Sequence, residues 1–225
     1  MGFEALPERL AQVRAVLAQR AAQPVTIVAV TKGFGTDAVR AALAAGIADI
    51  GENRVQEAVQ KQDELGAGGT GLGIRWHLIG HLQRNKARLV VGRFDIVHSL
   101  DALELATELN RRLQAPLRVL LQVNVAGESQ KSGCAPDETP ALARQVAAME
   151  HLQLEGLMTM APLTDDEDAQ RRTFRGLRVL RDRIKEEEGL WLPTLSMGMS
   201  GDYASAVQEG ATVIRLGTVL FGPRT

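Results

Sequence analysis

The chain has 225 residues, of which 45% are hydrophobic and 24% charged, and its formal net charge at pH 7 is −1. This balance is ordinary for a soluble globular protein, and with few aromatic residues it argues against binding to nucleic acid or to an anionic membrane. Cys134 is the single cysteine, which excludes an internal disulfide, and the amino terminus carries early acidic residues without a long apolar run. We therefore expect a cytoplasmic protein with neither a signal peptide nor a membrane span.

Short β-branched runs alternate along the chain with patterns rich in alanine and leucine. The spacing of Leu6, Leu10, Val13 and Leu17 predicts a leading helix over residues 4–20. The expected strands then cover residues 25–30, 47–50, 75–79, 95–99, 117–125, 152–159, 194–197 and 212–216. The expected intervening helices cover residues 36–45, 55–65, 83–91, 102–113, 136–148, 166–188 and 202–208, with a glycine-rich loop at 66–73. Thr36 is a plausible N-cap and Gly46 a plausible helix stop.

Eight strands, each but the last followed by a helix, predict a single α/β domain over residues 1–225, a (β/α)8 TIM-type barrel with an extra N-terminal helix. The length is close to the ~250 residues usual for such barrels. An open doubly wound sheet is the alternative. It seldom needs eight units, however, and no Gly-x-Gly-x-x-Gly motif follows the first strand.

Lys32 follows the first expected strand, at the end of the barrel where such proteins carry their chemistry. Desolvation at the lip of a dry barrel destabilises the charged form of a lysine, so its amine becomes a nucleophile towards an aldehyde. From position alone, a solvated loop lysine or a partner for a nearby acid is an equally good interpretation.

Two further loops have features of a phosphate site. Ser200-Gly201-Asp202 is typical of a helix N-terminus capped by Ser200, and Gly217-Thr218 follows the eighth strand. Barrels frequently bind phosphate with the loops after strands seven and eight. Ordinary turn chemistry is the alternative for each loop taken alone.

Buried polar residues are the remaining candidates. Arg215 lies in the eighth strand among apolar neighbours, where it needs either a structural ion pair or a ligand. His77 and His81 share a face if their segment is extended, but no third ligand lies near them, so we expect no metal site. His98 and His151 are interpreted as structural residues.

A set of motifs spans nearly the whole chain: Val28–Lys32, Gly51–Glu57, Trp76–Lys86, Val97–Asp101, Gln122–Val125, Glu128–Gly133, Gly156–Met160, Leu195–Asp202, Ile214–Thr218 and Phe221–Gly222. In this order they resemble the pyridoxal phosphate homeostasis proteins of the YggS/PROSC type. Any one motif is weak, but together they are highly specific.

The resemblance implies a barrel similar to the amino-terminal domain of alanine racemase, with pyridoxal 5′-phosphate (PLP) as its cofactor. It implies that Lys32 forms a Schiff base with PLP and that Lys131 takes part in cofactor transfer. Relatives often carry a second lysine and a proline after the first lysine, whereas this chain has Gly-Phe-Gly-Thr. The other cofactor-binding residues implied are Asn53 and His77 lining the pocket, Ser200, Gly201, Gly217 and Thr218 at the phosphate, and Arg215 near the pyridine nitrogen.

Racemisation needs a proton donor and an acceptor on opposite faces of the substrate carbon. Lys32 serves one face, but in alanine racemases the other residue is a tyrosine from a separate carboxyl-terminal domain of the partner subunit. This chain ends at Thr225, and its one tyrosine, Tyr203, lies beside the expected phosphate loop. We therefore expect a monomer that stores, buffers or delivers PLP to PLP-dependent apoenzymes, with no catalytic residue and no or marginal catalysis. The alternatives are a small PLP-dependent amino-acid racemase, and a cofactor-free barrel acting on a phosphorylated sugar or as a scaffold.

Overall fold

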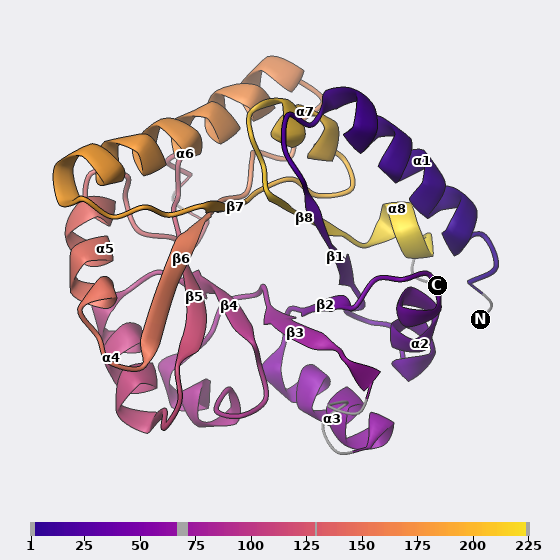
Figure 1. Cartoon of the computed structure of the whole chain (residues 1–225), viewed down its shortest axis with the longest axis horizontal. Coiled ribbons are helices and arrows are strands. Elements are labelled where there is room, and N and C mark those ends of the chain that lie inside the picture. Colours follow the sequence, from indigo (N-terminus) through magenta and orange to yellow (C-terminus); the bar gives the residue numbers. More distant parts are fainter. Residues whose placement is uncertain (1–2, 67–71, 129, 224–225) are drawn as a thin grey trace.

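Eight parallel strands close into a barrel in chain order, β1 to β8, and helices surround it (Figure 1). The computed structural model describes residues 3–66, 72–128 and 130–223. The strands are β1 (Thr26–Val30), β2 (Asp49–Glu52), β3 (Arg75–Leu78), β4 (Ile96–Leu100), β5 (Leu117–Gln122), β6 (Leu152–Met158), β7 (Thr194–Ser196) and β8 (Val213–Leu216). The helices are α1 (Leu6–Arg20), α2 (Thr36–Ala44), α3 (Val55–Leu65), the 3-10 helix η2 (Arg84–Leu89), α4 (Leu103–Arg112), α5 (Thr139–Ala147), α6 (Glu167–Glu188), α7 (Tyr203–Gln208) and α8 (Thr218–Phe221). The predicted (β/α)8 barrel with a leading helix is confirmed.

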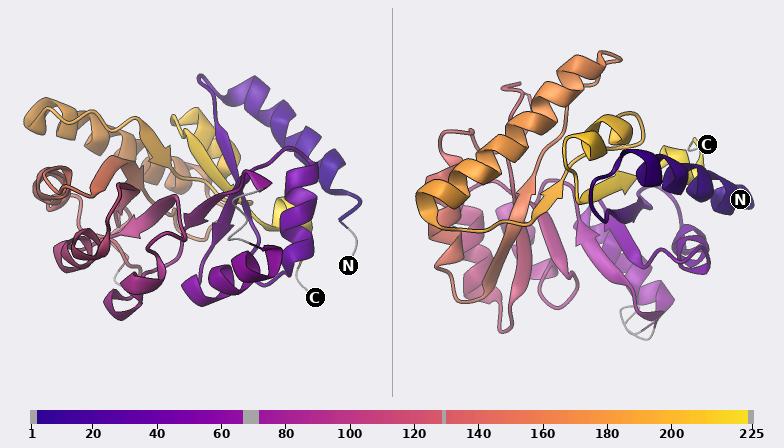
Figure 2. Two further views of the ribbon diagram at one scale, coloured as in Figure 1. Left: turned by 60° about the horizontal axis from the view of Figure 1, so that its bottom comes forward. Right: turned by 45° about the horizontal axis from the view of Figure 1, so that its top comes forward.

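The leading helix α1 packs beside α7 and α8, where the two ends of the barrel sequence meet (Figures 1 and 2). Phe3, which precedes α1, Phe34 after β1 and Phe221 in α8 form a three-ring cluster with centroids 5.4–5.7 Å apart. Arg9 of α1 also donates to the Leu220 carbonyl oxygen at 3.3 Å. The extra helix therefore fixes the loop that carries Lys32 against the last turn of the chain.

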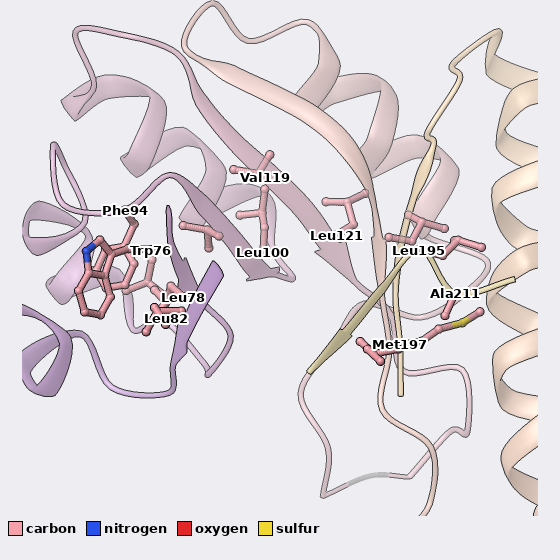
Figure 3. Packing of buried hydrophobic residues seen from close by; sticks show 14 of the residues in the cluster. Trp76, Leu78, Leu82, Phe94, Leu100, Val119, Leu121, Leu195, Met197 and Ala211 are labelled. Atoms are coloured by element: carbon pink, nitrogen blue, oxygen red, sulfur yellow. The ribbon is translucent and has the colours of Figure 1, made fainter. Parts of the chain in front are cut away.

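Strand side chains alternate between two environments, as the period of two requires. The outward set packs with the helices in one apolar cluster, part of which is shown in Figure 3; on β3 these residues are Trp76 and Leu78. The residue between them, His77, is 1% exposed and belongs to the inward set. The barrel interior is unusually polar, because its buried inward residues include His77, His98, Ser196 and Arg215.

The expected elements differ from the observed ones in a few places. The second strand lies at Asp49–Glu52 rather than 47–50, because it pairs in register with β3 from Asp49↔Arg75 to Glu52↔Leu78. The helix expected over 83–91 is a short 3-10 turn, and α8 was not anticipated.

The cap predicted at Thr36 is wrong, since Gly35 occupies the N-cap position of α2 without a side-chain cap bond. Gly46 does lie just beyond α2 with φ +79°, as a helix stop requires. Residues 67–71 of the glycine-rich loop lie outside the described residues. Within the described ranges, no helix is both long and apolar enough to cross a membrane.

Candidate functional site

Lys32 lies on the loop after β1 and is half-buried. It lines a small cavity of about 30 Å³ together with Val30, Phe34, Gly217, Thr218 and Gly222. These residues come together because β1 pairs with β8 when the barrel closes, with Val28 opposite Arg215. The structure thus brings the predicted lysine to the predicted loop after β8.

A buried ion pair supports the backbone on either side of Lys32. Lys61 of α3 donates to the Thr31 carbonyl oxygen at 2.8 Å and to Glu52 Oε1 at 2.5 Å. Thr31 Oγ1 donates to the same carboxylate oxygen at 2.5 Å. On the other side, the Gly33 amide donates to Glu57 Oε1 at 2.6 Å, and Lys61 also holds Glu57 at 2.9 Å.

The two carboxylates of this group have opposite pKa shifts. Burial raises the pKa of Glu52 even though the charge of Lys61 opposes the change, and Glu52 Oε2 has no hydrogen-bond partner among the described residues. Partial burial also acts to raise the pKa of Glu57, but the Gly33 amide and Lys61 outweigh it and hold that pKa below its usual value. The group fixes the direction of the chain at Lys32.

The loops after β7 and β8 are joined through Ser200. Its hydroxyl oxygen accepts from the amides of Gly217 at 3.3 Å and Val219 at 3.2 Å, at the start of α8. The predicted cap of α7 by Ser200 is therefore wrong, because Asp202 occupies that N-cap position. Ser200 instead satisfies amides that face the loop after β7, while exposed Gly201 leaves open space on that loop.

Asp202 and Lys131 approach this region from different loops. Asp202 accepts from the Met199 amide, and burial raises its pKa against the opposing charges of Arg215 and Lys131. Lys131 follows β5 and donates to Glu128 Oε1 at 2.5 Å and to the Ala161 carbonyl oxygen at 2.9 Å. Its ammonium group is thus already held by neighbouring loops at the carboxyl end of the barrel.

Arg215 is 4% exposed inside the barrel. Its Nη1 donates to Ser196 Oγ at 2.6 Å and its Nη2 to the Thr159 carbonyl oxygen at 3.0 Å. Burial lowers its pKa to about 10, with the charge of Asp202 acting in the opposite direction. Among the described residues no carboxylate forms an ion pair with Arg215, so neutral acceptors hold this guanidinium and leave further N–H groups available.

The two remaining predicted residues lie on neighbouring strands. Asn53 is half-buried after β2, and its carbonyl oxygen approaches Gly80 so closely that a Cβ at Gly80 would lie 2.2 Å away. His77 lies deeper, with its ring nitrogens 3.0 Å from Asp49 Oδ1 and 2.9 Å from His98 Nε2. His77 lines a separate cavity of about 170 Å³ that residues from the starts of the strands surround, at the end opposite Lys32.

The sequence analysis missed the residues that hold the loop of Lys32 and the side chain of Arg215 in place through hydrogen bonds. Glu52 and Lys61 were not singled out, although Glu57 and Lys61 stand four residues apart on one helix, the spacing of an ion pair. His98 was interpreted as structural, and Ser196 was not considered. A larger hollow of about 540 Å³ lies over α3 and η2, away from all the predicted residues, so cavity volume does not mark the site. No cluster able to hold a metal ion was found in the part of the chain that the structure describes.

Comparison with known proteins gives matches over most or nearly all of the chain. The family model described as alanine racemase, N-terminal domain, matches residues 5–225. A pyridoxal phosphate homeostasis protein of Pseudomonas aeruginosa is 44% identical over 228 aligned positions, covering 97% of this chain and 96% of the relative. The protein of the same name from Aquifex aeolicus is 41% identical over 80% of this chain and 78% of its own length.

Solved structures also match along nearly the whole chain. PipY of Synechococcus elongatus with PLP bound is similar with a TM-score of 0.84 and 39% identity, over 96% of this chain and all of that one. An alanine racemase from Corynebacterium glutamicum has a TM-score of 0.74 at 18% identity, over 96% of this chain but 61% of that one. That second likeness concerns the fold alone.

Proposed function

Because the chain belongs to the family of the alanine racemase N-terminal domain, we propose that it binds PLP through Lys32 and serves in the intracellular homeostasis of that cofactor. The observation that carries the proposal is the position of Lys32, which shares its cavity with Gly217 and Thr218. An amine and a candidate phosphate-binding loop on adjoining strand ends match the aldehyde and the phosphate of PLP. Lys32 would hold PLP through its side-chain amine, and the cofactor would supply the aldehyde that reacts with that amine.

The residues around Lys32 fit this ligand. The Ser200 hydroxyl and the amides of Gly217 and Val219 form a group of donors that would bind a phosphate. Gly201 and Thr218 lie on the same two loops and would line the phosphate site. Arg215 presents its remaining N–H groups to the pyridine nitrogen, and Asn53 lies on the adjoining loop. Residues 1–225 act as one PLP-binding domain.

A carrier or buffer agrees better with the cavity than a racemase. The ionisable residues on the adjoining loops are engaged by other partners, Lys131 by Glu128 and the Ala161 carbonyl oxygen and Asp202 by the Met199 amide, whereas racemisation needs an acid and a base on opposite faces. We expect a monomeric protein of the cytoplasm that keeps the PLP aldehyde sequestered and releases the cofactor to PLP-dependent apoenzymes. Lys131 assists that release, since it lies on a neighbouring loop with its ammonium group close to Asp202.

The test is the visible absorption of the purified protein with added PLP. The parent should show a band that borohydride reduction converts into an adduct, and peptide mass mapping should place the adduct on Lys32. Lys32→Arg keeps the charge but cannot form the Schiff base, so it should lose the band. Lys185→Ala is the matched control, because Lys185 stacks on Trp191 at the outer helix α6; it should keep the band. An adduct on a different lysine would refute the assignment.

The carrier role needs two further measurements. Mixing the PLP-loaded protein with a PLP-dependent apoenzyme should restore that enzyme's activity, while amino-acid racemisation should stay at background. Racemisation at ordinary enzymatic rates of ~1–10³ s⁻¹ would instead establish the racemase.

A further inference from the structure

A continuous row of hydrogen bonds crosses the interior of the barrel. Arg215 Nη1 lies 2.6 Å from Ser196 Oγ, which lies 2.9 Å from His98 Nδ1. His98 Nε2 lies 2.9 Å from His77 Nδ1, and His77 Nε2 lies 3.0 Å from Asp49 Oδ1. All five side chains are nearly or fully buried. Because Asp49 lines the cavity at the starts of the strands, the row runs from Arg215 to the end of the barrel opposite Lys32. We name these five residues the interior relay.

The chemistry of its two ends gives the interior relay one direction. A guanidinium can only donate hydrogen bonds and a carboxylate can only accept them. With both imidazoles neutral and protonated at Nε2, Arg215 donates to Ser196, Ser196 to His98, His98 to His77, and His77 to Asp49. Each bond then has one hydrogen, and no donor faces another donor. If either imidazole carried a second hydrogen, two donors would face each other at one contact of the row. Only a change of direction of the hydrogen bonds beyond that contact would avoid this.

The surroundings favour the neutral form of His98. Burial, together with the charges of Arg215 and Arg118, lowers the pKa of His98 well below its usual value. Asp49 stays ionised, since hydrogen bonds from His77 and Arg75 outweigh its burial and hold its pKa at about 2.

The far end of the interior relay reaches a second opening. The cavity of about 170 Å³ there is lined by both histidines and by charged residues from several strands. The charged groups that face the histidines are Asp49, Arg75, Arg118, Glu155 and, from the other side, Arg215. Of the two carboxylates in this set, Asp49 hydrogen-bonds to His77, whereas Glu155 lies 3.9 Å from Arg118.

We propose that the interior relay is a positioning device for the cofactor, in which Asp49 acts through His77, His98 and Ser196 to orient Arg215 towards the pyridine nitrogen. This inference rests on the proposed function, because it places the ring nitrogen beside Arg215. Ser196 and Thr159 take two of the five N–H groups of the guanidinium, which fixes its plane. Arg215 can then only donate to the ring, so the pyridine nitrogen stays unprotonated. His77 and His98 are positioning residues that never touch the cofactor.

The first test needs no cofactor. The chain has four histidines, so nitrogen-15 spectra of labelled, cofactor-free protein can be assigned with His77→Gln and His98→Gln. At pH 7.5 both buried imidazoles should be neutral, with the hydrogen on Nε2. A hydrogen on Nδ1 of either ring, or on both nitrogens of one ring, would overturn the interior relay. The tautomers are read from the parent protein, and the two variants serve only to assign its signals.

The second test changes the charge at the far end of the interior relay. The protonated nitrogen that would link Lys32 to PLP is positive, so Asp49→Asn removes a negative charge that stabilises it. The pKa of this nitrogen, followed through the visible band, should therefore fall by about one unit. Affinity for PLP should fall about three- to tenfold. Glu155→Gln is the matched control, because it removes a carboxylate from the same cavity without touching the row, and both quantities should stay as in the parent.

The outcomes distinguish a failure of the coupling along the interior relay from a failure of the proposed function. An unchanged band in Asp49→Asn would refute the coupling, and an equal shift in Glu155→Gln would show an unspecific effect of charge and refute it as well. A parent without any visible band would refute the proposed function, while the tautomers in the cofactor-free protein would still decide whether the interior relay exists.

Discussion

The ammonium nitrogen of Lys61 lies 2.8 Å from the carbonyl oxygen of Thr31, the residue immediately before Lys32. The same nitrogen forms an ion pair with Glu52 at 2.5 Å, and the side chains of Lys61 and Glu52 are 5% and 0% exposed. A helix that follows the second strand thus positions the loop that follows the first. Because the pair is buried, removing either member leaves an uncompensated charge in a low dielectric.

Lys61→Met should therefore destabilise the protein strongly. The expected loss in the free energy of unfolding is about 3–5 kcal/mol, since Glu52 would remain buried without its cation. Urea denaturation followed by circular dichroism measures it. The double variant Lys61→Met/Glu52→Gln, which removes both charges, should recover part of the loss. A single variant within 1 kcal/mol of the parent would show that the ion pair does not hold this loop.

Asp49 makes stability depend on acidity. Its pKa is lowered to about 2 in the folded protein from an ordinary value of 3.8. A lowered carboxyl pKa contributes stability above the unfolded value and loses it as the pH falls through the folded one. The advantage of the parent over Asp49→Asn should shrink by about 1 kcal/mol between pH 5 and pH 3, and by about 2 kcal/mol near pH 2. Denaturant titrations at several pH values measure the difference, and a constant difference would contradict the assignment.

Gly156 permits a close approach of two strands. A Cβ added there would lie 1.9 Å from the carbonyl oxygen of Thr194 on β7, which neither backbone can avoid. Gly156→Ala should lower the free energy of unfolding by at least about 2–3 kcal/mol, as forced overlap in a packed interior does. Gly201→Ala is the control, because a Cβ there meets no atom within 4 Å. Thermal unfolding of both variants tests the comparison, and equal melting temperatures would refute it.

Glu209 binds three arginines of α6 at once. Its side chain is 3% exposed, and it pairs with Arg171 at 2.8 Å, Arg175 at 3.0 Å and Arg178 at 3.4 Å. Hydrogen bonds from Arg175 and Arg171 hold the pKa of Glu209 below its usual value. Glu209→Gln should reduce stability by about 1–3 kcal/mol, because three like charges lose their common acceptor. Glu187→Gln, which breaks an exposed pair with Arg183, should change it by less than about 1 kcal/mol. Equal effects in the two variants would show that burial of Glu209 adds nothing.

The sequence by itself determined the barrel and the place of Lys32. Eight apolar strands alternating with helical patterns leave few other architectures, and side-chain period is a local property that the chain carries in its order of residues. The same reasoning put Gly217 and Thr218 at the same end of the barrel as Lys32, because strand ends of a parallel barrel share one rim; the structure brings them into one cavity. Element boundaries were less certain: β2 moved by two residues once its pairing with β3 set the register.

The tertiary structure alone decided which polar groups meet. Ser200 satisfies amides of Gly217 and Val219 rather than its own helix, and His98 bonds with Ser196 across the barrel. Such partners come from strands and loops far apart in the sequence, and hydrogen bonding needs contact within about 3 Å and a suitable angle. No local pattern encodes those distances. They follow from the closure of the barrel, which makes neighbours of residues that the chain keeps apart.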